Sequence, residues 1–254
     1  MKLLRVRASN YKNCADDFTI DLVAKSKKTS EDKEYELQEI AEELYVFNTA
    51  AFVGKNASGK TSAIELMECA YSILSEFRLE DKHYNYDNVK LEIIFFHENS
   101  IYKYNTVLKE DPNLGSIADF TEQHIYRKKY YKSKVKDIYS ENGFEEIEDL
   151  GELPEDTSIV FFVLKKKATR AVYFNCDGEG ADTYRLMFRA MKTYKISREV
   201  LTKVMKIFDD KIESLEMMDE KHYKLTYQNH VRELSDSELV YMLSSGTTKG
   251  ALLY

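Results

Sequence analysis

Gly54-Lys55-Asn56-Ala57-Ser58-Gly59-Lys60-Thr61 is a complete G-x-x-x-x-G-K-T sequence, and it decides the fold class that we expect for this chain. Small residues allow several backbone N–H groups to curl around a phosphate chain, and the helix that follows directs the positive end of its dipole at the same charge. Lys60 is expected to reach the β- and γ-phosphates of a nucleotide, and the Thr61 hydroxyl is expected to bind Mg²⁺. The loop therefore predicts binding of ATP together with Mg²⁺.

The residues on either side of the loop have the pattern that this motif requires. Leu44–Phe47 and Ala50–Val53 form an apolar run before the loop, which predicts a buried strand that enters it. After the loop, apolar residues recur at helical spacing on one face, namely Ile64, Met67, Tyr71, Leu74 and Phe77. A chance match in a surface turn is the alternative, and the order of strand, loop and helix argues against it.

The composition limits the class of protein. The 254 residues are 43% hydrophobic and 32% charged, which is typical of a globular domain rather than a disordered chain. The net charge of −7 argues against a nucleic-acid binder that works through overall positive charge. Three widely spaced cysteines predict neither a disulfide framework nor a zinc site, and no apolar window reaches the length of a membrane span. We therefore expect a cytoplasmic protein with no membrane partner.

Alternating patterns predict strands at 2–8 and 17–23, and a hairpin of 91–96 with 101–107 around His97-Glu98-Asn99-Ser100. Shorter strands are expected near 123–127, 133–139 and 159–164, and further strands at 212–217 and 223–227. Helical spacing predicts two helices, with apolar faces of Tyr184, Met187, Phe188 and Met191, and of Val200, Val204, Ile207 and Phe208.

A second motif lies near the end of the chain. Leu243-Ser244-Ser245-Gly246-Thr247 contains a Ser-x-Gly core, which suits a helix N-terminus that presents a hydroxyl and N–H groups to an anion. Taken alone, this stretch is more often an ordinary turn or helix cap. It resembles the L-S-G-G-Q signature of ATP-binding-cassette ATPases, and its combination with the phosphate loop favours that interpretation.

The start of the chain carries a further resemblance. A short strand, then Asn10-Tyr11-Lys12-Asn13, then Phe18-Thr19-Ile20-Asp21, looks like the opening of RecF, SMC and OLD-type ATPases. The resemblance implies a P-loop NTPase fold of the ATP-binding-cassette type, with a mixed sheet, an antiparallel strand subdomain and a helical insertion. It also implies an ATPase domain made of a nucleotide-binding lobe (1–110), a strand-rich insertion (111–180) and a helical region that ends in the signature (181–254).

The same resemblance implies residues and partners. The nucleotide would be bound by the loop and by the first turn of the chain, through Gly54, Asn56, Ser58, Gly59, Lys60, Thr61, Ser62 and Lys12. Two protomers would close head to tail around ATP, with Ser244, Ser245 and Gly246 of one facing the loop of the other. Many such ATPases act in anti-phage, abortive-infection or DNA-repair systems, so a nuclease or toxin effector is the expected partner.

One part of that pattern is missing. Such ATPases need a hydrophobic strand ending in Asp-Glu after the signature, because its Asp supports Mg²⁺ and its Glu polarises the attacking water. Residues 1–254 contain no such strand. We therefore expect the N-terminal part of a longer ATPase, or an interrupted copy, which binds ATP but hydrolyses it poorly. A non-catalytic ATP-gated interaction module and a small-molecule kinase are the alternatives.

A basic run with interleaved tyrosines lies at Tyr126–Lys136. It predicts a nucleic-acid contact through Arg127–Lys136, with charges on phosphates and rings against bases. A solvated edge strand, with Lys132, Lys134 and Lys136 on one face, is the more common explanation of such a run. The five histidines show no ligand spacing, so no metal beyond the Mg²⁺ of the nucleotide is expected.

Overall fold

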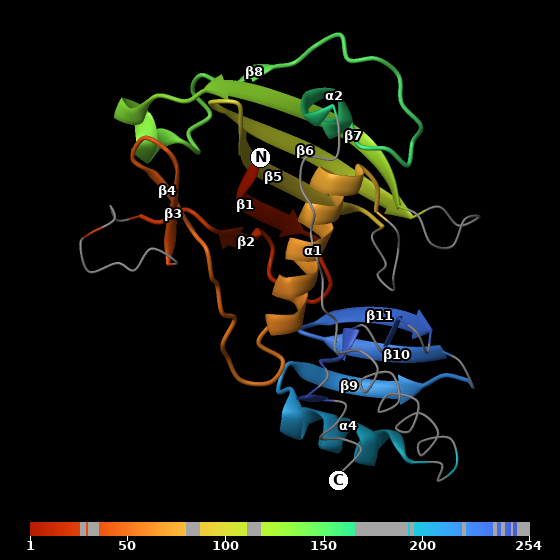
Figure 1. Cartoon of the computed structure of the whole chain (residues 1–254). Coiled ribbons are helices and arrows are strands. Elements are labelled where there is room, and N and C mark those ends of the chain that lie inside the picture. Colours follow the sequence, from red (N-terminus) through yellow and green to blue (C-terminus); the bar gives the residue numbers. More distant parts are fainter. Residues whose placement is uncertain are drawn as a thin grey trace. The chain divides into compact units, whose positions relative to one another are not determined.

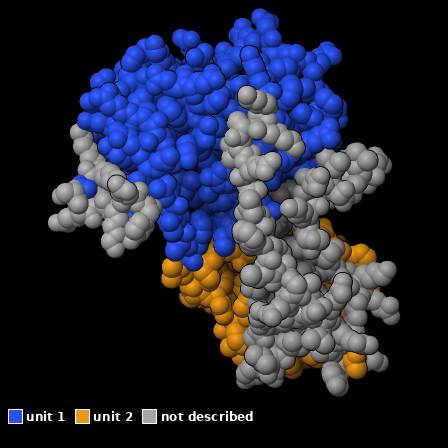
Figure 2. Space-filling model, viewed as in Figure 1, with its two compact units in different colours: residues 1–52, 63–81, 86–172 blue, residues 53–62, 82–85, 173–254 orange. Residues whose placement is uncertain are grey.

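The computed structural model describes residues 1–25, 29, 36–79, 87–110, 118–165, 193, 196–219, 222–235, 238–239, 242–244 and 246–247. The protein is a mixed α/β chain whose sheets are antiparallel. It divides into two compact units (Figure 2), of which unit 1 comprises residues 1–52, 63–81 and 86–172, and unit 2 comprises residues 53–62, 82–85 and 173–254. No helix in the described ranges is long and apolar enough to cross a membrane.

A six-stranded antiparallel sheet forms the centre of unit 1 (Figure 1). Its strand order is β2-β1-β5-β6-β7-β8, so the first strand of the chain lies inside the sheet between β2 and β5. The strands are β1 (Lys2–Ser9), β2 (Phe18–Asp21), β5 (Val89–His97), β6 (Ser100–Glu110), β7 (Ala118–Lys129) and β8 (Glu145–Glu146).

The predicted hairpin at residues 91–107 is confirmed. β5 and β6 pair in register through Phe96↔Ile101 and His97↔Ser100, and Glu98 and Asn99 form the two-residue turn. Both turn residues have positive φ, at 45° and 59°. Positive φ at both central positions is the type I′ geometry, whose twist matches that of the two strands.

Helix α1 (Lys60–Glu76) follows the phosphate loop, as predicted, and Figure 1 shows it across one face of the central sheet. The predicted apolar face is confirmed only in part. Leu74 and Phe77 are buried, but Ile64 is exposed and Met67 and Tyr71 are only half-buried. The buried residues of α1 are Ala63, Glu65, Leu66, Cys69, Ala70, Ile73, Leu74 and Ser75. The apolar spacing allowed either face, because apolar residues cover more than half of the helix circumference.

A second, smaller sheet joins β3 (Leu37–Ala41) to β4 (Leu44–Phe47) in unit 1. One core cluster of that unit contains Leu44 and Val46 of this hairpin together with central-sheet residues Leu4, Ile94 and Ile101. Tyr130 extends the same cluster, and its hydroxyl donates to the Glu42 carbonyl at 2.6 Å.

Two predicted short strands are wrong. Residues 132–137 form the 3₁₀ helix η1 (Lys132–Asp137), and residues 160–164 form the helix α2 (Val160–Leu164). In α2, Phe161 packs edge-on against Phe77 with ring centroids 5.5 Å apart. An apolar run of five residues fits a buried strand or one helical turn equally well, so contacts outside the run decide its conformation.

Unit 2 contains a three-stranded antiparallel sheet, in the order β11-β10-β9, and the helix α4 (Arg198–Phe208). The strands are β9 (Ile212–Met217), β10 (His222–Tyr227) and β11 (His230–Ser235). The first two were predicted, and β11 was not. The Ser197 side chain accepts from Val200 N and so caps α4 at its start.

The buried face of α4 also differs from the prediction. Val200 and Ile207 are 52% and 58% exposed, whereas Leu201 and Met205 are buried in the unit 2 core with β-strand residues such as Tyr223 and Leu225. The other predicted helix, with Tyr184, Met187, Phe188 and Met191, lies outside the described residues.

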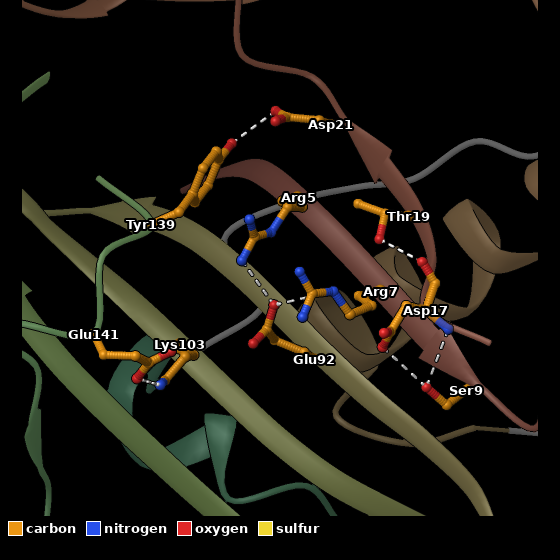
Figure 3. Close-up of polar contacts among 10 residues, drawn as sticks. All are labelled: Arg5, Arg7, Ser9, Asp17, Thr19, Asp21, Glu92, Lys103, Tyr139 and Glu141. Carbon is orange, nitrogen blue, oxygen red and sulfur yellow. Dashed lines mark hydrogen bonds and ion pairs between the residues drawn. The ribbon is translucent and has the colours of Figure 1, made fainter. Parts of the chain in front are cut away.

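Charged and polar side chains occupy part of one face of the central sheet (Figure 3). Arg5 donates to Glu92 Oε1 at 2.9 Å, and Arg7 approaches the same oxygen at 4.0 Å. The Arg5 guanidinium lies 4.0 Å from the centroid of the Tyr139 ring, and the Tyr139 hydroxyl donates to Asp21 at 2.7 Å. This network connects β1, β2 and β5 to the segment that follows η1.

Candidate nucleotide-binding site

The approach to the phosphate loop corrects one prediction. β4 ends at Phe47, and residues 48–54 have no regular structure. Ala50 and Ala51 are exposed and Val53 is 91% exposed, so Ala50–Val53 is not a buried strand. β4 pairs with β3 in the small sheet, and on its other side it bonds to the segment after β2, where Ala24 N donates to the Tyr45 carbonyl and Phe47 N to the Leu22 carbonyl. An apolar run cannot distinguish a buried strand from an exposed connection when no partner strand is known.

The loop backbone has alternating left-handed residues. Ala57 has φ of 58° and Gly59 has φ of 86°, and α1 starts at Lys60. Left-handed residues within a turn rotate successive N–H groups toward one concave side, which is the geometry of an anion-binding nest. Gly59 fits this role because glycine adopts positive φ without steric cost. The chemistry of this backbone therefore suits an anion, and the helix dipole of α1 adds to the same effect.

Two side chains of the loop lie close to its first residue. A Cβ at Gly54 would lie 2.4 Å from Ser58 Oγ, so a larger residue there would force the Ser58 side chain to move. Lys60 Nζ donates to the carbonyls of Gly54 at 2.9 Å and Lys55 at 2.7 Å. The ammonium group thus lies over the first two residues of the loop. Thr61 is exposed and Ser62 is half-buried.

The signature turn is capped by its own serine. Ser244 Oγ accepts from Thr247 N at 3.0 Å and lies 2.8 Å from Thr247 Oγ1. A serine that accepts from the N–H three residues ahead is the arrangement of a helix N-cap, as the sequence predicted for this stretch. Leu243 and Thr247 are both buried. Ser245 lies outside the described residues.

Unit 2 brings the two motifs together. A Cβ at Gly246 would lie 2.6 Å from Cγ and from Oδ1 of Asn56, and 2.9 Å from Nδ2. The carboxamide of the third loop residue therefore rests on the glycine of the signature turn in the same chain. The sequence predicted both segments as parts of one phosphate site, but it contained no signal for this contact within one chain.

Lys12 lies in unit 1, in the turn after β1, and it forms an ion pair with Glu65 of α1. Both side chains are only 10% exposed. Burial lowers the pKa of Lys12, and the nearby Glu65 carboxylate opposes that change. In this structure the Lys12 ammonium group neutralises the buried Glu65 carboxylate. The approach of Lys12 to a nucleotide therefore stays a prediction.

Several side chains of the basic run Tyr126–Lys136 form contacts within unit 1. Lys132 pairs with Glu42, Lys128 donates to the carbonyls of Asp137 and Ser140, and Arg127 donates to Ser100 Oγ. A cavity of about 850 Å³ lies beside the run. Its wall includes basic residues and tyrosines and also three acidic residues, Asp137, Glu145 and Glu146. The mixture of charges weakens the electrostatic argument for nucleic acid.

No group of three or more His, Cys, Asp and Glu side chains that could hold a metal ion occurs among the described residues. In Ile207-Phe208-Asp209-Asp210, an apolar pair followed by two acidic residues, Phe208 is the last residue of α4 and Asp209 is its C-cap, so this sequence is not the end of a strand. Comparison of the chain with protein-family models and with curated proteins found no match.

Proposed function

We propose that the chain binds ATP with Mg²⁺ through Gly54–Thr61 and belongs to the cassette type of P-loop ATPase. The observation that carries the proposal is the loop backbone, with left-handed Ala57 and Gly59 directly before a helix of 17 residues. Backbone N–H groups in this arrangement favour a polyphosphate over a single carboxylate, because several donors converge on one side.

Each predicted ligand would have a defined task in such a site. Lys60 would leave the carbonyls of Gly54 and Lys55 and pair with the β- and γ-phosphate oxygens. The exposed Thr61 hydroxyl would bind Mg²⁺, as a hard oxygen ligand. Asn56, Ser58 and Ser62 would complete the polar lining.

Two protomers would dimerise around ATP and thereby control an effector, such as a nuclease or a toxin, in anti-phage defence or DNA metabolism. The support is the resemblance of three segments, residues 1–22, 44–79 and 234–254, to OLD, RecF and SMC ATPases. An ATP-gated module without turnover of its own is the alternative, ahead of a small-molecule kinase.

The test is a titration of the chain with a fluorescent ATP analogue in the presence and absence of Mg²⁺. We expect saturable binding that Lys60→Ala weakens by about 10- to 100-fold, the range for loss of a hydrogen bond to a charged group. Lys55→Ala is the matched control, since its exposed side chain belongs to the same loop. Absence of saturable binding by folded protein would overturn the proposal.

A further inference from the structure

We propose that Asn56 latches the Ser244–Thr247 turn onto the phosphate loop of its own chain. The inference rests on the function proposed above, because the latched loop is the proposed phosphate site. It adds regulation to that site, since the same glycine cannot contact its own loop and a partner's loop at once.

The contact leaves no space for a side chain. A Cβ at Gly246 would lie 2.6, 2.6 and 2.9 Å from the three outer atoms of the Asn56 side chain. Real Cβ atoms almost never come closer than 3.0 Å to another heavy atom. Any side chain at residue 246 would force the Asn56 carboxamide to move, so an approach this close needs glycine at that position. Close approach of one backbone to another group is a specific use of this residue.

The turn that carries Gly246 is held in place by buried residues on either side of it. Leu243 and Leu239 are buried in the unit 2 core, and Leu243 N donates to the Leu239 carbonyl at 3.1 Å. Thr247 is also buried, and its backbone N–H donates to Ser244 Oγ. Asn56 thus rests on a preformed surface, which reduces the conformational entropy lost when the contact forms.

The latch affects dimerisation because the Asn56 side chain covers Gly246. A loop from a second protomer can reach Gly246 only after the Asn56 carboxamide has moved away. A nucleotide that favours the dimer must therefore open the latch, and it can do so only to the extent that it binds the open state more tightly. Latched monomer and ATP-closed dimer are then mutually exclusive states.

A cysteine pair tests the contact directly. Because Asn56 Cβ is one bond from Cγ, it lies within about 4 Å of a Cβ at Gly246, and disulfides need about 3.5–4.5 Å between Cβ atoms. The chain would carry Asn56→Cys and Gly246→Cys, with Cys14→Ser, Cys69→Ala and Cys176→Ser to remove the native thiols. Mild oxidation without nucleotide should give an internal disulfide in a monomer, found by non-reducing electrophoresis and peptide mass spectrometry.

The single-cysteine variants are the controls and should form no internal disulfide. A covalent dimer as the main product, or no disulfide in the folded double variant, would overturn the latch. With Mg²⁺ and a non-hydrolysable ATP analogue, internal oxidation should slow by about tenfold, within the usual range of coupling between sites. An unchanged rate in protein shown to be saturated with the analogue would also contradict the proposed regulation.

Hydrogen exchange gives a test that needs no cysteines. Asn56→Ala should speed exchange in peptides that cover 242–247 by about fivefold or more in the nucleotide-free chain, while Lys55→Ala should not. Equal exchange in Asn56→Ala and the unmodified chain would overturn the latch. Oxidation without nucleotide and hydrogen exchange of the nucleotide-free chain do not depend on nucleotide binding, so failure of the latch and failure of the proposed function are separate results.

Discussion

Lys12 and Glu65 form an ion pair inside unit 1 that joins the turn after β1 to helix α1. Removal of one partner of a buried pair leaves an uncompensated charge, and this is strongly destabilising. We expect Glu65→Ala to lower the free energy of unfolding by about 3 kcal/mol or more, measured by urea denaturation. Lys132→Ala, which breaks the more exposed pair with Glu42, is the control and should change the free energy of unfolding far less. Equal effects of the two substitutions would contradict the pairing.

The Tyr139 hydroxyl gives a prediction for alkaline pH. Burial first, and then the hydrogen bond to Asp21 and its charge, raise the pKa of Tyr139 above its ordinary value. The unfolded chain therefore loses this proton at lower pH than the folded one does. The stability that depends on the neutral hydroxyl is complete below a pH of about 10 and is lost as the pH rises further.

The comparison of the native chain with Tyr139→Phe isolates this contribution. The variant should be less stable by about 1 kcal/mol at neutral pH, because a single hydrogen bond is lost. The difference between the two proteins should shrink above pH 10, since only the native chain carries the group that titrates. A difference that stays constant from pH 8 to 11 in urea denaturation would exclude the Asp21 hydrogen bond as its source.

The corrected face of α4 predicts opposite results for neighbouring positions. Met205→Ala should destabilise the protein by about 2–5 kcal/mol, because it empties a buried site in the unit 2 core. Ile207→Ser should change stability by no more than about 0.5 kcal/mol, because that side chain is mostly exposed. Thermal unfolding followed by circular dichroism distinguishes the two, and the reverse order would restore the face expected from spacing alone.

The positive φ of Gly59 predicts that its substitution weakens ATP binding. A Cβ there meets no atom within 4 Å, yet φ is +86°, so Gly59→Ala adds strain of about 1 kcal/mol without a clash. We expect weaker binding of ATP by about fivefold. Gly54→Ala, by contrast, clashes with Ser58 Oγ, so Ser58→Ala should restore part of its affinity. Rescue of Gly59→Ala by the same second substitution would contradict this distinction.

The exposure of individual lysines in the basic run Tyr126–Lys136 shows which of them to change in a test of nucleic-acid binding. Lys129, Lys134 and Lys136 are exposed, whereas Lys132 is paired with Glu42. If single-stranded nucleic acid binds here, Glu substitutions of these three lysines should weaken binding and flatten its salt dependence. The matched comparison is between the single variants: Lys134→Glu should weaken binding more than Lys132→Glu, which changes the charge by the same amount at a paired lysine. Unchanged affinity and salt slope in the triple variant would remove this partner.

Local patterns predicted those elements whose signal is contained in a few adjacent residues. The β5–β6 hairpin follows from alternation on both sides of Glu98-Asn99, and α1 follows from its start after Gly59. Gly59 also has the positive φ that glycine adopts without steric cost. In each case backbone preference and side-chain pattern agree, which is the condition for a reliable inference.

Predictions that needed distant partners were less successful. Ala50–Val53 has the composition of a strand, but no strand pairs with it in the described part of the chain. Lys132–Asp137 and Val160–Leu164 became helical turns, because tertiary contacts override the propensity of short runs. The contact of Asn56 with Gly246 joins segments far apart in sequence, and neither residue type announces it.

The internal position of β1 has a consequence for synthesis on the ribosome. β1 forms a hairpin with β2, but its other edge pairs with β5, so that Lys2 meets Phe96. A growing chain therefore exposes one unpaired edge of β1 until β5 has left the exit tunnel. During that interval the nascent hairpin is open to wrong strand partners, and chaperones that shield such edges should improve the yield of folded protein.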